Sequence, residues 1–507
     1  MLIAMALMVM VLSAAVLVSF GNQGFLIGGE TSSEAMGKAQ ELLEGEQAQA
    51  RKDFNLVNSI ASTTDGIYEK AVYTRLLPDF LTKEVKALIS WKNERQLTRN
   101  LEVTTLIANF ETPVGGSTCD SSLPGTSALP GYWHTPTVVN GATDFATLVG
   151  DPAGTYTLAD VDAYIGRLYV VANSTSASNK ETLFVFDISN PSSPSLIGKI
   201  DNEGAGGTVS QGPNAVRISK DPVSGNTYAY LGNGYNANYA TCTPGPRCAE
   251  LQVANVTSMP PTMTANLMLA SSTAPFVTGP HRGNALFYRN GYLLLGLSSV
   301  GGSGPEFHIM DVHSVSTLSG SKIASGEEVG NFTVANDVNA LTMRGTYAYI
   351  GSPNTRELQI LNVTNPASPS LAGYFDSPSG SGNGKSLALI GNTLYLGVTV
   401  PNVGSDFHIL DNTNPGAALP ELGPGIDIPS SVNGLIVRDY LSFLLTNTDL
   451  RIYRTDTPSS PTAWGALALP ASGSATEPSL DCEGNYLYVT ANDATNHGKL
   501  YVVTSSP

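Results

Sequence analysis

Residues 346–373 read TYAYIGSPNTRELQILNVTNPASPSLAG and contain three short runs typical of β-strands. The runs Thr346–Ile350 and Leu358–Ile360 alternate apolar residues with others, which is the pattern of a strand with a buried face. The turn residues Asn365-Pro366 separate the second run from a third around Leu371. The stretch therefore predicts consecutive short strands joined by tight turns.

The second of these runs belongs to a repeat. A triplet of the form apolar–variable–apolar occurs seven times, and successive copies lie 43 to 68 residues apart. Several copies follow another alternating run, as at residues 167–171, 346–350, 393–397 and 486–490, and several precede an Asn-Pro or Thr-Pro turn, as at residues 190, 365 and 457. The seven triplets are Leu183-Phe184-Val185, Leu251-Gln252-Val253, Phe307-His308-Ile309, Leu358-Gln359-Ile360, Phe407-His408-Ile409, Leu450-Arg451-Ile452 and Leu500-Tyr501-Val502.

Four short strands in units of about 45–50 residues indicate a seven-bladed β-propeller, here over residues 135–507. The seventh unit reaches the C-terminus where its fourth strand should begin, so we predict that residues 136–148 supply that strand. Such pairing would close the ring and leave no open strand edge. The motif Asp187-Ile188-Ser189-Asn190-Pro191 resembles those of the LVIVD-repeat propellers of bacterial and archaeal surface proteins. That resemblance implies a fold and a surface location more than an activity.

The N-terminal end carries a different signal. The first charged residue is Glu30, and about 20 apolar residues are enough to span a bilayer. A cleaved signal or a membrane anchor would usually have a basic flank, whereas the first basic residue is Lys38. We therefore predict that residues 1–28 form a filament-core or transmembrane helix whose short basic leader has been removed. Its core residues are Met1, Met5, Met8, Val11, Ala15 and Phe20, and a break follows at Gly21, Gly24, Gly28 and Gly29.

Residues 29–111 predict a second helix and a small sheet. Thr31-Ser32-Ser33-Glu34 has the form of a capping box. Apolar residues recur at helical spacing from Ala35 to Ile60, and we expect the helix to stop near residues 62–66. Alternating segments at 67–77, 80–91 and 97–110 predict a small antiparallel sheet. Residues 112–134 are rich in Gly, Ser and Pro and are predicted to be a linker.

The N-terminal part, residues 1–111, resembles type IV pilins. The resemblance rests on the run from Ser19 to Gln23, the helix 35–54, the triplet Ile89-Ser90-Trp91 and residues 101–110. It implies leader removal by a prepilin peptidase, helices bundled in a filament core and a glycine-rich stretch that is not helical in the filament. Met5 departs from the family pattern, because type IV pilins usually have Glu at this position. Met5 in place of Glu is compatible with a minor or tip subunit of the filament.

Composition limits the chemistry of the chain. The net charge is −16, which argues against nucleic acid as a partner. No hydrolase elbow, zinc-protease motif or complete calcium loop is present, so we predict no catalytic residue, no cofactor and no metal. His308 and His408 share the variable position of the repeat with Gln252, and we expect both to be exposed and independent. A tethered enzyme is a weaker alternative, since propeller sites assemble from scattered residues.

Cysteines and sequons suggest the modifications of a surface protein. Cys242 and Cys248 flank a Pro/Gly turn and are one candidate disulfide, and Cys119 with Cys482, at the two ends of the predicted propeller, is the other. Four unpaired thiols are the alternative. Candidate glycosylation sequons begin at Asn173, Asn255, Asn331 and Asn362.

Together these signals predict a structural subunit of an extracellular type IV pilus-like filament. Copies would be inserted in the cytoplasmic membrane, polymerise through helix 1–28 with the pilus assembly machinery, and display the propeller on the cell surface. The alternative is a minor or tip pilin whose propeller binds a carbohydrate or protein ligand. The expected fold class is mainly β: a seven-bladed β-propeller preceded by a long N-terminal α-helix and a small antiparallel pilin-type sheet.

Overall fold

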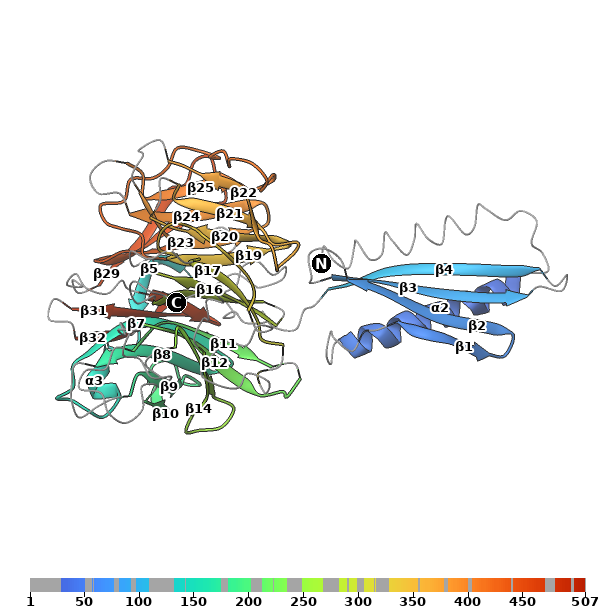
Figure 1. The fold of residues 1–507 in the computed structure, drawn as a ribbon, viewed down its shortest axis with the longest axis horizontal. Coiled ribbons are helices and arrows are strands. Elements are labelled where there is room, and N and C mark those ends of the chain that lie inside the picture. Colours follow the sequence, from blue (N-terminus) through green and yellow to red (C-terminus); the bar gives the residue numbers. More distant parts are fainter. Residues whose placement is uncertain are drawn as a thin grey trace. The chain divides into compact units, whose positions relative to one another are not determined.

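A computed structural model of the chain describes residues 29–50, 57, 59–76, 82–92, 97–108, 132–141, 143–174, 181–201, 212–221, 223–234, 249–267, 282–289, 291–298, 305–313, 315, 328–353, 356–377, 382–399, 404–438, 441–469, 479–493 and 497–506. The predictions for residues 1–28 and for most of the linker 112–134 lie outside these ranges. The chain divides into two compact units, Met1–Glu111 and Thr112–Pro507, of which the first is blue in Figure 1.

The first unit packs one helix on one sheet (Figure 1). On helix α2, buried Ala35, Ala39 and Leu43 recur at helical spacing and meet a sheet face that includes Val85 and Ile89. These contacts give the unit its own apolar core. Helix α2 spans Gly29–Ala50, and the antiparallel sheet runs in the order β1 (Ile60–Asp65), β2 (Tyr68–Leu76), β3 (Thr82–Lys92) and β4 (Thr98–Ala108).

Both ends of helix α2 differ from the sequence prediction. Gly29 is its first residue, so the prediction that Gly29 breaks the helix is wrong. The helix ends at Ala50 rather than near residue 62, and Ile60, 39 % exposed, begins strand β1 instead of continuing the apolar stripe. The β-branched residues of this segment favour a strand, and they pair with β2 across a turn at Gly66, where φ is 66°.

A long N-terminal helix is not shown. Helix α2 has 22 residues, and within the described ranges no helix combines the length and apolar character needed to cross a membrane.

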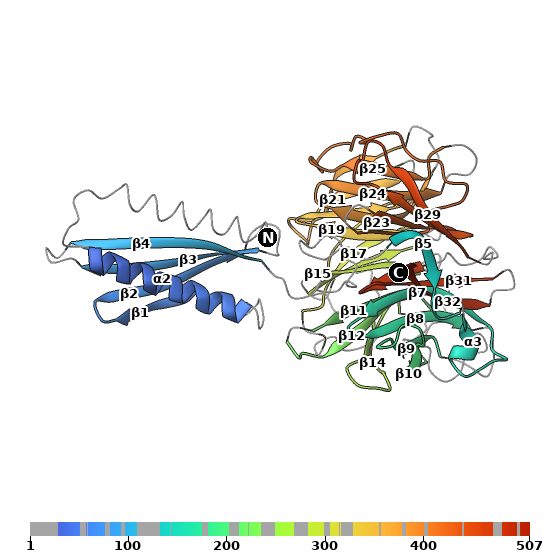
Figure 2. The ribbon, with the colours of Figure 1, turned by 180° about the vertical axis from the view of Figure 1, so that it is seen from behind.

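The second unit is a β-propeller-like repeat, and seven antiparallel sheets lie within its described residues (Figures 1 and 2). The first four sheets contain β7 (Tyr156–Tyr164), β8 (Arg167–Ser174), β9 (Leu183–Asp187) and β10 (Ser195–Ile200); β11 (Pro213–Lys220), β12 (Thr227–Asn233), β13 (Leu251–Asn255) and β14 (Thr262–Leu267); β15 (Gly283–Arg289), β16 (Tyr292–Leu297), β17 (Phe307–Asp311) and β18 (Glu328–Phe332); and β19 (Ala340–Arg344), β20 (Tyr347–Gly351), β21 (Leu358–Asn362) and β22 (Ser370–Phe375).

The remaining sheets complete a ring. They contain β23 (Asn383–Ile390), β24 (Thr393–Thr399) and β25 (Phe407–Asp411); β26 (Gly434–Arg438), β27 (Leu441–Leu445), β28 (Asp449–Arg454) and β29 (Thr462–Ala468); and β30 (Ser479–Glu483), β31 (Tyr486–Asn492) and β32 (Gly498–Ser506) with β5 (Tyr132–Val138). The first strands contact one another in succession, from β7 through β11, β15, β19, β23 and β26 to β30, and β30 contacts β7 again. We refer to the junction of β30 with β7 as the ring seam.

The repeat read from the sequence is confirmed at the level of strands. Each of the seven triplets lies in the third strand of a sheet: β9, β13, β17, β21, β25, β28 or β32. The Asn-Pro and Thr-Pro motifs form turns before the fourth strand. In these turns Ser193 N donates to Asn190 O at 3.0 Å, and Ser460 N donates to Thr457 O at 2.9 Å. The turn residues and the alternation of apolar residues therefore predicted these strands and turns correctly.

The last sheet joins the two ends of the second unit. Strand β5 pairs antiparallel with β32, with Val138 opposite Val503, and the short β6 (Thr143–Asp144) also pairs with β32. The predicted donor segment, residues 136–148, is therefore only partly a strand. Residues Phe145–Leu148 form the short helix α3, because the Asp144 side chain accepts a hydrogen bond from Ala146 N and caps it.

The fifth sheet has three named strands rather than the expected four. An irregular segment runs beside β25 in place of a fourth strand, with isolated bridges from Phe407 to Ile426 and from Leu410 to Glu421. Its backbone bonds, including Leu422 N to Ile409 O at 2.8 Å, cover part of the edge of β25.

Candidate functional site

Buried and half-buried acidic side chains in the second unit form two sets. We call the first the seam carboxyls: Asp160 and Asp162 on β7 with Asp481 and Glu483 on β30. The second, the strand-start acids, precede the repeat triplet in five successive sheets: Glu250, Glu306, Glu357, Asp406 and Asp449. Charged residues are seldom buried unless they are paired, so both sets are candidates for function.

The seam carboxyls accept hydrogen bonds from backbone groups of the neighbouring sheet. Asp481 Oδ2 accepts from Ala163 N at 2.7 Å, and Glu483 Oε1 accepts from Gly166 N at 2.8 Å, so both tie β30 to the first sheet. On the other side, Asp162 Oδ2 accepts from Ile218 N on β11 at 2.6 Å. The carboxyls therefore link three consecutive sheets through their first strands.

Asp162 has the most altered electrostatics of this set. It is 1 % exposed, and burial raises the pKa of its carboxyl well above the usual range. The Arg217 guanidinium, whose Nη1 lies 3.5 Å from Asp162 Oδ1, acts in the opposite direction, while the adjacent Asp481 raises the pKa further. Burial, together with the charge of Asp481, also raises the pKa of Glu483, although the bond from Gly166 opposes this.

Two of the strand-start acids, Glu306 and Glu357, bind the segments that lead to the next sheet. Glu357 is fully buried and accepts from Ser377 N and Ser377 Oγ, both at 2.8 Å, and from Gly382 N at 3.2 Å, on the segment leading to the next sheet. Glu306 Oε2 likewise accepts from Val334 N at 2.8 Å. Their carboxyl oxygens are acceptors for backbone donors that would otherwise be buried unpaired.

The variable residue of the triplet is buried in six of the seven sheets, with Arg451 the exception, so the sequence prediction that His308 and His408 are exposed is wrong. His308 and His408 are 1 % and 2 % exposed, since sheets stacked on both sides cover the middle strands. His308 Nδ1 lies 2.9 Å from Glu328 Oε1, and His408 Nδ1 lies 2.6 Å from Glu421 Oε1. They lie in separate sheets, each with its own glutamate, so the expectation that they act independently agrees with these contacts.

The His308–Glu328 contact has an electrostatic consequence. Burial alone would raise the pKa of Glu328, but the hydrogen bond and charge of His308, with a bond from Asn331, outweigh it and lower the pKa.

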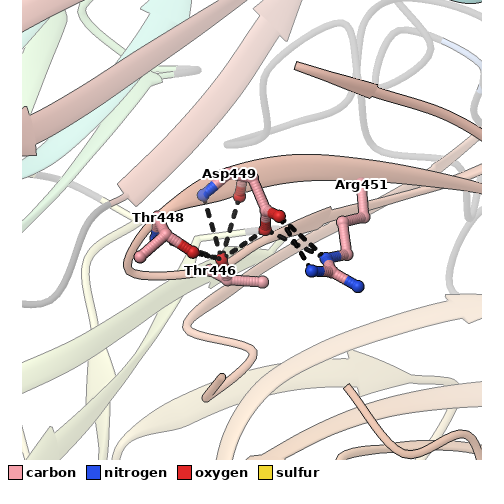
Figure 3. A network of polar contacts seen from close by, with 4 residues as sticks. All are labelled: Thr446, Thr448, Asp449 and Arg451. Carbon is pink, nitrogen blue, oxygen red and sulfur yellow. Dashed lines mark hydrogen bonds and ion pairs between the residues drawn. The ribbon is translucent and has the colours of Figure 1, made fainter. Parts of the chain in front are cut away.

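The sixth sheet replaces histidine with arginine (Figure 3). Arg451 Nε lies 3.0 Å from each carboxylate oxygen of Asp449, and Arg451 Nη2 lies 2.9 Å from Oδ2. Thr446 Oγ1 donates to Asp449 Oδ1 at 2.6 Å and accepts from Thr448 N at 3.1 Å. The network closes the hairpin between β27 and β28, and the bond to Asp449 raises the pKa of Arg451.

Two of the candidate glycosylation residues have a structural explanation. Asn255 Oδ1 accepts from Thr257 N and Asn362 Oδ1 accepts from Thr364 N, both at 2.9 Å, at the end of a third strand. Asp187 makes the same turn in the first sheet. Asn173 is half-buried on β8, whereas Asn331 is exposed on β18. Glycosylation of all four stays a prediction.

The other predicted residues are placed as follows. Cys482 is buried and disulfide-bonded, and Arg438 Nη1 lies 3.5 Å from its Sγ. Its three candidate partners, Cys119, Cys242 and Cys248, lie outside the described residues, so both proposed pairings stay predictions. The filament-core residues and Gly21, Gly24 and Gly28 also lie outside them.

The chemistry of both sets is the anchoring of backbone N–H groups by carboxyl oxygens. No group of three or more His, Cys, Asp or Glu side chains in the described ranges could hold a metal ion. Sequence reasoning missed both sets of acids. The sequence did carry a signal for the strand-start acids, because an acidic residue stands directly before the triplet in five consecutive repeats. It carried no such recurring signal for the seam carboxyls, so comparison of the repeats could not have found them.

Comparison with known proteins supports the repeat. The LVIVD repeat family matches residues 177–202 and 335–377. No curated protein matches the chain. Similar solved structures include the AfRom2 CNH domain (8 % identity, 74 % of this chain and 99 % of that chain, TM-score 0.41), Sqt1 of Saccharomyces cerevisiae (10 %, 75 % and 100 %, 0.40) and the N-terminal domain of Nup159 (12 %, 75 % and 99 %, 0.39). The LVIVD match and the four-stranded sheets described above support a β-propeller-like repeat fold.

Proposed function

We propose that this chain is a structural subunit of an extracellular, type IV pilus-like filament. Copies polymerise through residues 1–28 and display the second unit, a seven-bladed β-propeller, on the outside. One observation carries the proposal: helix α2 begins at Gly29, directly after the apolar segment, and packs on a small antiparallel sheet. That order, an apolar segment, a helix and a sheet, is the one expected of a pilin.

The physical argument concerns the apolar segment. At roughly 25 cal/mol per Å² of apolar surface, burying some 20 apolar residues among neighbouring copies contributes tens of kcal/mol per subunit before entropy costs. Water cannot accommodate that surface, whereas a filament core can. In the predicted assembly the propeller is joined to the core through the linker 112–134 and remains outside it.

The test is electron microscopy of filaments sheared from the native cells, with mass spectrometry of the same fraction and gold labelling against the second unit. We expect this chain to be the dominant component and the label to follow the whole filament. Filaments built of another protein would refute the structural role. A matched variant that begins at Gly29, studied as purified protein, should be monomeric and should not enter filaments.

A second candidate is a minor or tip pilin whose propeller binds a carbohydrate or protein ligand. The observation that favours it is Met5, which stands where the pilin pattern has Glu. Gold label confined to filament ends would support this candidate over the first. In both cases we propose an extracellular location with disulfides Cys119–Cys482 and Cys242–Cys248, which peptide mapping without reduction tests directly.

A further inference from the structure

We infer that the third and fifth sheets each contain a proton-dependent tie. His308 binds Glu328 and His408 binds Glu421 as doubly protonated imidazolium rings, and each contact is released when the ring loses a proton. We call these two contacts the histidine ties. All four residues lie within the second unit, so the inference does not depend on the proposed function.

Both ring nitrogens of His308 face acceptor atoms. Nδ1 lies 2.9 Å from Glu328 Oε1, and Nε2 lies 2.9 Å from the carbonyl oxygen of Pro305. A carbonyl oxygen only accepts, so Nε2 must carry a hydrogen to bond it. A neutral imidazole has a single N–H, so its Nδ1 would then face the carboxylate as a second acceptor. The two hydrogen bonds together therefore require one further proton, on Nδ1 or on the carboxyl group.

The surroundings of Glu328 place that proton on the ring. Asn331 Nδ2 donates to Glu328 Oε1 at 2.8 Å, so this oxygen accepts from two side chains. The hydrogen bond and charge of His308, with the bond from Asn331, outweigh burial and lower the pKa of Glu328. An ionised Glu328 cannot donate, and Nδ1 of His308 must therefore be the donor.

His408 repeats this geometry in the fifth sheet. Its Nδ1 lies 2.6 Å from Glu421 Oε1, and its Nε2 lies 2.9 Å from the carbonyl oxygen of Ser405. In both sheets this carbonyl belongs to the residue three positions before the histidine. The carboxyl comes from the segment outside the third strand, which is β18 in the third sheet and the irregular segment beside β25 in the fifth. Each tie thus holds an outer segment to a third strand.

The neighbouring sheets place donors of constant charge at the same position of the triplet. Gln252 Nε2 donates to Asn266 Oδ1 at 2.8 Å, Gln359 Nε2 donates to Val334 O at 3.4 Å, and Arg451 binds the carboxylate beside it. Amide and guanidinium groups remain donors throughout the physiological pH range. Histidine loses a donor near neutral pH. The third and fifth sheets therefore differ from the second, fourth and sixth in having a contact that pH can switch.

The groups around the rings favour the protonated form. The strand-start acids Glu306 and Asp406 stand two residues before the histidines and bind backbone N–H groups of the following segment. The Phe375 ring on β22 lies 5.0 Å from the His408 ring, centroid to centroid. Each histidine therefore has two carboxyl groups on or beside its own strand, and negative charge stabilises an imidazolium cation.

The geometry sets the sign of the pH dependence. Without its second proton, Nδ1 of His308 and Oε1 of Glu328 would be two acceptors 2.9 Å apart, so the closed tie holds the proton. An opened tie frees an ordinary histidine, which loses this proton at about pH 6.5. The stabilisation is therefore present on the acid side of the histidine range and is lost as the pH rises. At the other limit, the lowered pKa of Glu328 means that its carboxylate stabilises the tie above pH 4.5 and less as the pH falls further.

The test is hydrogen exchange of the full chain, followed by mass spectrometry across this pH range, in wild type, His308→Gln and His408→Gln. Glutamine is the natural residue at this position in the second and fourth sheets, and it keeps a donor at every pH. The reporters are the amides of β18 for His308 and the Leu422 amide, which donates to Ile409 O at 2.8 Å, for His408. Neither reporter changes in sequence, so at each pH the ratio of wild-type to variant rates reports opening of the tie.

We expect this ratio to rise with pH by up to about tenfold per pH unit while the ring releases its proton. Each variant is also the control for the other sheet: His308→Gln should leave the Leu422 amide with its wild-type pH dependence, and His408→Gln should do the same for β18. If His308→Gln does not fold, Glu328→Gln replaces it. Its amide can donate to a neutral ring, so the pH dependence of β18 should again disappear.

Nitrogen-15 NMR of the chain labelled at histidine reads the charge state directly. At pH 7 it should show doubly protonated rings whose signals are lost in His308→Gln and His408→Gln. A ratio that does not change with pH at either reporter, or singly protonated rings at both positions, would overturn the inference.

Discussion

Trp133→Ala tests how strongly β5 closes the ring. Trp133 is fully buried, and its ring meets that of Phe443 at 4.9 Å in an edge-to-face arrangement. It belongs to a core cluster with residues of the sixth and seventh sheets, including Leu450 and Leu487. A tryptophan buries about 200 Å², which at about 25 cal/mol per Å² amounts to about 5 kcal/mol. Because alanine retains part of this area, we expect Trp133→Ala to lower the free energy of unfolding by about 4 kcal/mol. This value is within the range for large-to-alanine core changes.

The assay is urea unfolding of the full chain, followed by circular dichroism. The matched control is Trp464→Ala on β29, where the half-buried ring contacts His134 at 5.5 Å and the Arg454 guanidinium at 5.2 Å. Because the ring is only partly buried and makes one cation–π contact, Trp464→Ala should lower the free energy of unfolding by only about 1–1.5 kcal/mol. If Trp133→Ala cost no more than the control, β5 would not be an energetic part of ring closure.

Three further predictions use other parts of the chain. Glu357→Gln should destabilise the second unit by about 1–3 kcal/mol in urea unfolding, because the buried amide cannot accept all three donors that meet the carboxylate. Hydrogen bonds from two lysines lower the pKa of Asp65 from 3.8 to about 2, so its stabilisation is present above pH 3.8 and lost as the pH falls toward 2. Asp65→Asn should therefore lower the Tm of the first unit at pH 5 but not near pH 2, and equal shifts would contradict this. Gly283→Ala should destabilise by about 1–3 kcal/mol, since its Cβ would lie 2.6 Å from a facing Cα, whereas Gly45→Ala in helix α2 meets nothing within 4 Å and should stabilise; calorimetry separates the two.

The first unit shows where local patterns suffice and where they do not. The strands at 68–76, 82–92 and 98–108 follow from alternation alone, because each buries one face against helix α2. The helix end could not be predicted, because Val57 and Ile60 continue the helical spacing by coincidence. Pairing of β1 with β2 decides that segment, and such pairing is a tertiary effect.

For the second unit, the sequence by itself determined the repeat, the third strands, the turns before the fourth strands and the need for a strand from outside to complete the last sheet. These features depend on residues close together in the chain. Only the tertiary structure decided that His308 and His408 are buried, because burial depends on the neighbouring sheets. The same holds for the ring seam: the bond from Ala163 N to Asp481 spans 318 residues of sequence, and no local pattern encodes which groups meet when a ring closes.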